Sequence, residues 1–257
     1  MKIMVCVKQV PDAEAPFSIS SDGRSVSVAE GAWRLNGFDA FAVEEALRIR
    51  EAFPDTTVEA LTVGPARASD VLRRAMAMGA DRGIHILRPG EDDPLPGEVA
   101  ALIASSIGGR QLDLILAGVM AEDDMQGQTG PMLAEYLGLP CATAVMAQKI
   151  APAGEIARVE RELEGGLREA LELPLPALLT VQSGINRPRY PALSHVLRSR
   201  TQPIEIIHAG RLPVPPRRER IVRITRRETS GKTLFLAGTS REKAEYLADY
   251  FLEKALL

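Results

Sequence analysis

The sequence predicts an α/β fold in which a parallel β-sheet carries helices on both of its faces. Two observations predict it. Up to about residue 145, short apolar runs alternate with helical patterns, and this cadence implies right-handed crossovers between parallel strands. The run at residues 112–117 is strongly apolar, as expected of a strand that is buried on both sides.

The elements of the first half follow in chain order. Strands are expected at residues 2–7, 58–63, 83–87, 112–117 and 141–145, and helices at residues 39–52, 68–78, 96–108 and 129–137. The first helix places Phe41, Val43 and Leu47 on one face, with charged residues opposite. Gly79 follows the second helix, where a glycine commonly ends a helix. Asp22-Gly23 forms a good turn, which predicts a hairpin over residues 17–28.

After residue 145 the pattern changes to short pieces typical of antiparallel strands. These pieces are expected at residues 149–156, 158–163, 167–172 and 177–181, around Gly154 and Gly165-Gly166. A helix-like run follows at residues 193–200. We expect residues 1–209 to form one α/β domain that includes this hairpin.

From Gly210 onward the chain is rich in proline and arginine, which is typical of an extended arm. It ends in a predicted helix over residues 240–256, with Ser240 as the candidate N-cap and Leu247 and Phe251 on its apolar stripe. Residues 210–257 are therefore expected to form an arm and helix that pack on something, either this chain or a partner. The alternative is a solvated linker.

Composition excludes several classes of protein. The chain has 257 residues, 46% hydrophobic and 25% charged, as in globular proteins, and its net charge of −3 argues against a general nucleic-acid binder. No apolar run reaches the roughly 18 residues that span a bilayer, and the N-terminus lacks a secretory pattern. Cys6 and Cys141 are expected to be reduced core thiols, so a cytoplasmic location is predicted. The three histidines show no spacing for a metal or catalytic site.

In parallel sheets, ligands bind beyond the carboxyl ends of the strands, and three loops there are unusual: residues 8–12, 64–67 and 118–130. The last loop leads into a helix whose first backbone N–H groups form a ready phosphate site. Gly127 and Gly130 let the backbone approach an anion, and Gln128 and Thr129 add side-chain donors. The loop has no lysine of the GK[ST] type, which argues against hydrolysis of a triphosphate. The alternative is a polar loop that faces water.

The segment TVQSGINRPRYPAL, residues 180–193, cannot be regular structure, because Pro188 and Pro191 each remove a backbone donor. It offers Arg189, Tyr190 and Leu193 on a stiffened loop. Such a loop is typical of a surface that another protein recognises, and the alternative is an ordinary edge loop.

This segment resembles the signature of the small (β) subunit of electron-transfer flavoproteins. Further blocks resemble the same family and fall in family order from residue 1 to about 200: residues 5–12, 41–48, 77–85, 128–131 and 159–162, with Gly165-Gly166. The last fifty or so residues are weakly diagnostic. The resemblance implies an adenine-nucleotide α-hydrolase-like (Rossmann-like) fold and an electron carrier subunit that makes no bonds itself.

The resemblance also implies the cofactors and their residues. A structural AMP is expected on Cys6, Asn36, Gly37, Phe38, Asp39, Val63, Asp123, Asp124, Met125, Gln126, Gly127, Gln128, Thr129 and Gly130. FAD is expected to be shared with the large (α) subunit, with Glu162 near its flavin. Leu193 is implied as the apolar anchor for a flavin dehydrogenase of the acyl-CoA type, with Arg189, Tyr190 and Pro191 fixing the loop's shape. Electrons would leave to a membrane quinone oxidoreductase or a similar acceptor.

The sequence departs from both forms of the family. Met125-Gln126-Gly127 stands where electron-bifurcating relatives tend to show Asp-Thr-Ala, and Gly37 and Ala13 stand where other members place Pro and Tyr. AMP is favoured by Phe38-Asp39 and residues 128–130, but a second FAD with NADH as donor stays open. A nucleotide-sensing module explains only residues 1–145. An ATP-dependent carboxylate-activating enzyme needs an SGGxDS loop where this chain has KQVPD.

Overall fold

The computed structural model describes the chain except residues 30, 91–93, 152, 218, 227–232 and 255–257. It divides into two compact units, Met1–Ile224 and Thr225–Leu257, which are described separately. Parts of the expected arm, at residues 218 and 227–232, and the end of the expected terminal helix, at residues 255–256, lie outside the described residues.

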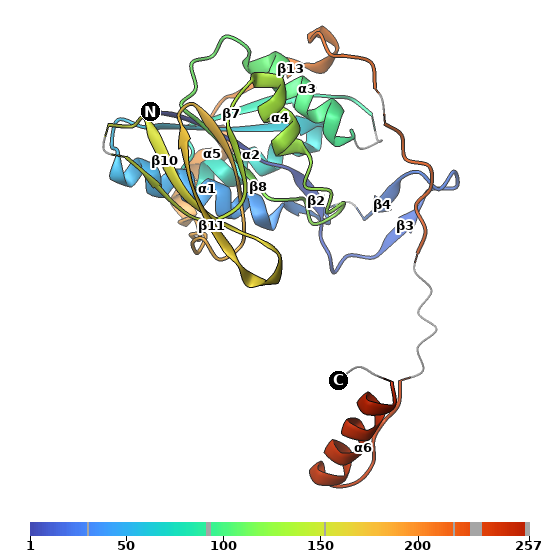
Figure 1. Ribbon diagram of the computed structural model, residues 1–257. Coiled ribbons are helices and arrows are strands. Elements are labelled where there is room, and N and C mark those ends of the chain that lie inside the picture. Colours follow the sequence, from blue (N-terminus) through green and yellow to red (C-terminus); the bar gives the residue numbers. More distant parts are fainter. Residues whose placement is uncertain (30, 91–93, 152, 218, 227–232, 255–257) are drawn as a thin grey trace. The chain divides into compact units, whose positions relative to one another are not determined.

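The first unit is built on a nine-stranded sheet in the order β11-β10-β9-β12-β8-β1-β6-β7-β13 (Figure 1). Its strands are β1 (Lys2–Cys6), β6 (Thr57–Gly64), β7 (Arg82–Leu87), β8 (Leu114–Gly118), β9 (Cys141–Ile150), β10 (Ile156–Glu162), β11 (Arg168–Pro174), β12 (Ala177–Val181) and β13 (Ile204–His208). The six strands from β12 to β13 pair in parallel, which confirms the predicted parallel sheet. Two short antiparallel ribbons accompany the sheet: β2 (Gln9–Pro11) with β5 (Trp33–Leu35), and β3 (Phe17–Ile19) with β4 (Val26–Val28).

Helices cover both faces of this sheet, as predicted. On one side lie α1 (Gly37–Ala52) and α2 (Ser69–Met78), and on the other α3 (Pro96–Ile107) and α4 (Thr129–Leu137). Successive side chains of β1 point to opposite faces of the sheet: Ile3 and Val5 pack with α1 and α2, while Met4 and Cys6 pack with α3 and α4. Each buried aliphatic side chain of these two cores contributes about 1.5–3 kcal/mol. Helix α5 (Leu193–Thr201) packs on α2.

The region after residue 140 differs from the prediction in two ways. Residues 141–150 form one strand, β9, rather than separate pieces, and β10 and β11 fold back on it as an antiparallel hairpin. Strand β12 was expected to be antiparallel, and this is wrong: it pairs in parallel with β8, Leu178 opposite Ile115, and with β9. All five residues of β12 are buried, as expected of a central strand in a parallel sheet.

The second unit holds helix α6 (Ser240–Glu253). Its N-cap is Thr239 rather than the predicted Ser240, because Thr239 and Glu242 form a reciprocal capping box: the backbone N–H of Thr239 donates to Glu242 Oε2 at 2.7 Å. No described residue of α6 is buried, and large apolar side chains are exposed along it: Tyr246, Leu247, Tyr250, Phe251 and Leu252. Its packing on a partner stays a prediction. Within the described residues, no helix is long and apolar enough to cross a bilayer.

Candidate functional site

A pocket lies at the carboxyl ends of β1, β6 and β8, where the fold class predicts a ligand. Its walls come from the loops that follow these strands and from the starts of α1, α3 and α4. It brings together ten of the residues expected to bind the nucleotide: Cys6, Asn36, Asp39, Val63, Asp124, Gln126, Gly127, Gln128, Thr129 and Gly130.

Asp39 ties the strand ends to α1 at the floor of this pocket. The backbone N–H of Lys8 donates to Asp39 Oδ2 at 2.7 Å, and that of Gly118 donates to Oδ1 at 3.0 Å. The side chain is buried, and desolvation raises the pKa of Asp39 to about 7 against the opposing effect of these hydrogen bonds. Gly118 is required here, because a Cβ would lie 2.5 Å from Asp39 Oδ1 and 2.7 Å from Phe38 Cβ.

Asn36 fixes the polar loop 118–130 to the beginning of α1. Its Nδ2 donates to the Met120 carbonyl at 2.9 Å, and its Oδ1 accepts from the Glu122 N–H at 3.2 Å. The Glu122 carboxylate in turn accepts from the N–H of Gly37 at 3.2 Å. The loop therefore has a defined shape before any ligand binds.

The far end of this loop is built to accept an anion. The first N–H groups of α4 have no carbonyl of a preceding turn to bind, and they face the pocket at Gln128, Thr129 and Gly130. Gly127 has a φ of +63°, which glycine adopts readily, and a Cβ on Gly130 would overlap Thr180 Cγ2. Gly130 thus lets α4 begin close against β12, and this side of the pocket is lined by Gly127, Gln128, Thr129 and Gly130.

Lys8 adds a cation at the pocket, but its charge is already matched. Its Nζ lies 2.8 Å from Asp123 Oδ1 and 3.0 Å from Asp124 Oδ2. Burial acts to lower the pKa of Lys8, yet the two carboxylates outweigh it and the pKa is raised. Lys8 is therefore charged and braces the loop.

The remaining expected cofactor residues lie outside the pocket lining. Gly37 lines a neighbouring groove, and Phe38 and Asp123 support the loop from behind. Met125 is 69% exposed. Glu162, at the end of β10, is exposed and accepts a hydrogen bond from Gln182 Nε2 at 3.0 Å.

Arg67 is a pocket residue to which the sequence assigned no role. It follows β6 in the loop 64–67, which had been singled out only as one of three unusual loops. The signal that could have identified it is its position: an arginine directly after a central parallel strand faces the ligand side of the sheet.

The four expected partner-binding residues divide into two groups. Tyr190 and Leu193 are 89% and 74% exposed, so both are presented to solvent. Pro191 is buried, and Arg189 turns inward, where its guanidinium pairs with Glu44. Tyr190 and Leu193 therefore offer contact surface, and Pro191 and Arg189 shape the loop.

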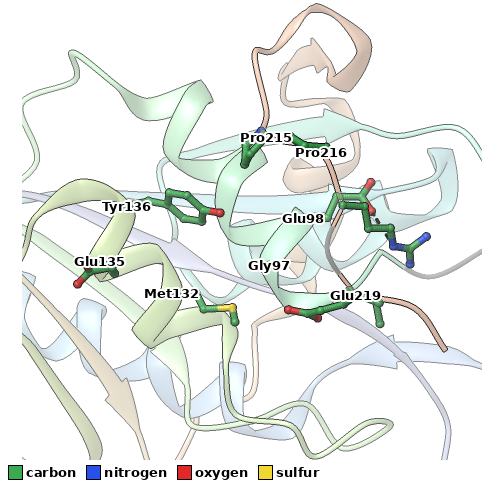
Figure 2. A pocket seen from close by; sticks show the side chains of 10 residues that line it. Gly97, Glu98, Met132, Glu135, Tyr136, Pro215, Pro216 and Glu219 are labelled. Atoms are coloured by element: carbon green, nitrogen blue, oxygen red, sulfur yellow. Dashed lines mark ion pairs between the residues drawn. The ribbon is translucent and has the colours of Figure 1, made fainter. Parts of the chain in front are cut away.

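A second cavity, of about 460 Å³, lies between α3, α4 and residues 215–217 and 219 of the arm (Figure 2). Figure 2 shows Met132 and Tyr136 of α4 on one side and Pro215 and Pro216 on the other. Three carboxylates line it, those of Glu98, Glu135 and Glu219, together with Arg217, whose Nε lies 3.8 Å from Glu98 Oε2. The carboxylates outnumber this one guanidinium, which disfavours a phosphate, and none of the expected nucleotide residues lines the cavity.

The chain is similar to known proteins over most of its length. The family model described as "Electron transfer flavoprotein domain" matches residues 25–211. The chain is 39% identical to "Electron transfer flavoprotein subunit beta" of Bradyrhizobium diazoefficiens, over 79% of this chain and 80% of the relative. It is 38% identical to the protein of the same name from Homo sapiens, over 83% and 84%, and to that from Methylophilus methylotrophus, over 80% and 78%. The fold, the order of the matched blocks and these identities lead to one conclusion: the chain belongs to the electron transfer flavoprotein family, as a subunit of the beta type.

Proposed function

We propose that this chain is the small subunit of a heterodimeric electron carrier, that it binds a structural AMP in the pocket at the ends of β1, β6 and β8, and that it covers FAD held mainly by the large subunit. The heterodimer, located in the cytoplasm, takes electrons from flavin dehydrogenases of the acyl-CoA type. It passes them to a quinone-linked acceptor at the membrane or to a similar acceptor. The chain makes and breaks no bonds itself.

One observation carries the AMP assignment: ten of the fourteen expected nucleotide residues, which come from four separate stretches of sequence, line one pocket. The donor set fits a monophosphate. Backbone N–H groups at the start of α4 satisfy one or two phosphate oxygens, while Lys8 is already neutralised by Asp123 and Asp124. A triphosphate would bring more negative charge than these groups balance.

The flavin, when bound, supplies the electron-transfer chemistry, and the chain supplies the surroundings. Glu162, the last residue of β10, and Gln182, the residue after β12, form a polar pair. In this proposal the pair lies against the flavin of the large subunit, and the Glu162 carboxylate sets the local field. The exposed stripe of α6 packs on the large subunit.

The test is to purify this chain with its large subunit, denature the complex and identify the released nucleotides by chromatography. One FAD and one AMP per heterodimer are expected. Two FAD without AMP would replace the AMP assignment by a second flavin, with NADH as the donor. A well-folded complex without either nucleotide would overturn the proposal and favour a stand-alone nucleotide-sensing module.

A further inference from the structure

Arg67 is a charged residue of the nucleotide pocket without an ion-pair partner in the described part of the chain. The two carboxylates that line the same pocket are already engaged: Asp39 by backbone N–H groups and Asp124 by Lys8. Among the residues that the structure describes, none forms an ion pair with Arg67, and its Nε is buried without a hydrogen-bond partner. A guanidinium without an ion pair and with an unpaired Nε–H is available to bind a ligand.

Its position is fixed from one side by an aromatic ring. The guanidinium carbon lies 4.0 Å from the centroid of the Trp33 ring, a cation–π contact. The backbone is held as well, because Gln9 Nε2 donates to the Arg67 carbonyl at 3.0 Å. Trp33 lines the outer groove and not the nucleotide pocket, whereas Arg67 lines the pocket and not the groove. Arg67 therefore contacts the indole of Trp33 and also belongs to the lining of the pocket.

The strand order sets the distance between Arg67 and the anion site. Helix α4 follows β8, and the loop that carries Arg67 follows β6, with β1 between them. Adjacent strands lie about 4.8 Å apart, so the two sites are separated by roughly 10 Å across the strand ends. A mononucleotide bridges such a span with its phosphate at α4 and its base toward Arg67. The neighbouring walls, Val63 and Pro65, are apolar and suit a flat heterocycle.

We propose that Arg67, backed by Trp33, is the platform on which the purine base of the nucleotide stacks. The planar guanidinium then lies between two aromatic systems, and both of its faces are used. This inference rests on the proposed function, because it places the phosphate of the same nucleotide at α4.

The experiment separates base contact from phosphate contact. The full chain, in complex with its large subunit, is loaded with labelled AMP, which is then displaced by AMP, adenosine or ribose 5-phosphate. Arg67→Met is expected to lower the affinity for AMP and for adenosine about tenfold each. The affinity for ribose 5-phosphate is expected to stay within about twofold of the wild-type value. Arg67→Lys, which keeps the charge but loses the plane, is expected to resemble Arg67→Met. Trp33→Leu is expected to give a smaller loss with the same pattern.

Arg74→Met is the matched control, because Arg74 also stacks on an aromatic ring, that of Tyr190 at 5.1 Å, but lines the outer groove. It is expected to leave the affinities for all three ligands unchanged. Thermal unfolding verifies that each variant is folded. Equal losses for AMP and ribose 5-phosphate in Arg67→Met would assign Arg67 to the phosphate and overturn the inference. Unchanged AMP binding in this variant would also overturn it and leave the proposed function standing. A wild-type complex that binds no AMP would overturn both.

Discussion

Arg189 and Glu44 form a two-pronged ion pair that joins the loop of residues 180–193 to α1. Arg189 Nε lies 2.8 Å from Glu44 Oε2, and Nη2 lies 2.9 Å from Oε1. The backbone N–H of Arg189 donates to the same carboxylate at 3.1 Å. Because the Glu44 side chain is only 7% exposed, water cannot easily replace these bonds, and they raise the pKa of Arg189 further above its ordinary value. The exposed Tyr190 and Leu193 thus take their positions from a buried carboxylate.

Glu44→Gln is expected to lower the free energy of unfolding by roughly 1–2 kcal/mol, less than for a fully buried pair because solvent reaches Arg189. Electron uptake from the dehydrogenase should slow as well, since Glu44 no longer holds Arg189 and the loop in place. Denaturant unfolding and stopped-flow reduction measure the two effects. Glu51→Gln, which removes the more exposed partner of Arg189, is the control; equal effects of both variants would contradict a special role of Glu44.

Leu193→Ala is expected to slow electron uptake, because an apolar anchor that fills a partner's pocket contributes on the order of 2 kcal/mol. The αβ complex and its flavin content should stay intact, because Leu193 is exposed and supports no core. Steady-state kinetics with the dehydrogenase measure kcat/KM. Ile206→Ala, an equally apolar exposed side chain on β13, should have no effect, and unchanged kinetics for Leu193→Ala would refute the anchor.

Glu162→Gln is expected to shift the flavin midpoint potential to a more positive value. A carboxylate beside the flavin opposes the addition of an electron, and the amide removes that opposition. Spectroelectrochemical titration of the heterodimer measures the potential. Glu160→Gln is the control on the same strand, where the carboxylate pairs with Arg168 at 3.5 Å. An unchanged potential and transfer rate in Glu162→Gln would remove Glu162 from the flavin site.

We expect the stability of the fold to depend on pH through the buried carboxyl group of Asp39. Burial raises its pKa from 3.8 to about 7, so the folded chain holds this proton more tightly than the unfolded chain. The contribution of Asp39 to the free energy of unfolding is therefore fully present below about pH 4 and falls as the pH rises to about 7. Urea unfolding of the wild type and of Asp39→Asn at several pH values measures the difference between them. Two parallel pH profiles would show that Asp39 does not titrate in this window.

Gly118→Ala is expected to destabilise the fold and to weaken AMP binding together, because its Cβ collides with Asp39 and Phe38. The strand end must shift, and such overpacking typically costs about 1–3 kcal/mol. Gly210→Ala is the matched control, since nothing lies within 4 Å of its Cβ and its φ is not positive. Thermal unfolding and nucleotide binding report both effects, and equal behaviour of the two variants would contradict the close approach at Gly118.

The parallel half of the fold could be predicted from the sequence because its signals are local. Each strand is a short apolar run closed by a turn, and each helix shows its own periodicity. The direction of β12 could not be predicted, because a five-residue apolar run fits a parallel or an antiparallel neighbour equally well. Its pairing with β8 depends on a contact across some sixty residues of sequence, Leu178 with Ile115, which periodicity does not encode.

The candidate site shows the same division. The carboxyl ends of parallel strands meet at one edge, so the loop 118–130 could be assigned to a pocket from its position alone. Asp39 was expected at the nucleotide site, but its hydrogen bond with Gly118 could not be predicted, nor could the contact of Arg67 with Trp33, because each joins distant segments of the chain. Arg189 was expected to shape the loop, but its partner Glu44 lies 145 residues away.

The connection from β12 to β13, residues 182–203, runs along α1 and α2 and re-enters the same sheet beyond four other strands. It is held on the way by Asn186, Arg189 and Arg73, whose guanidinium donates to the Ser199 carbonyl at 2.6 Å. A segment fixed at both ends and along its length has little conformational freedom left to lose when a partner binds. The docking proposed at Leu193 would therefore carry a small entropic penalty, which suits a carrier that must bind and release its partners many times.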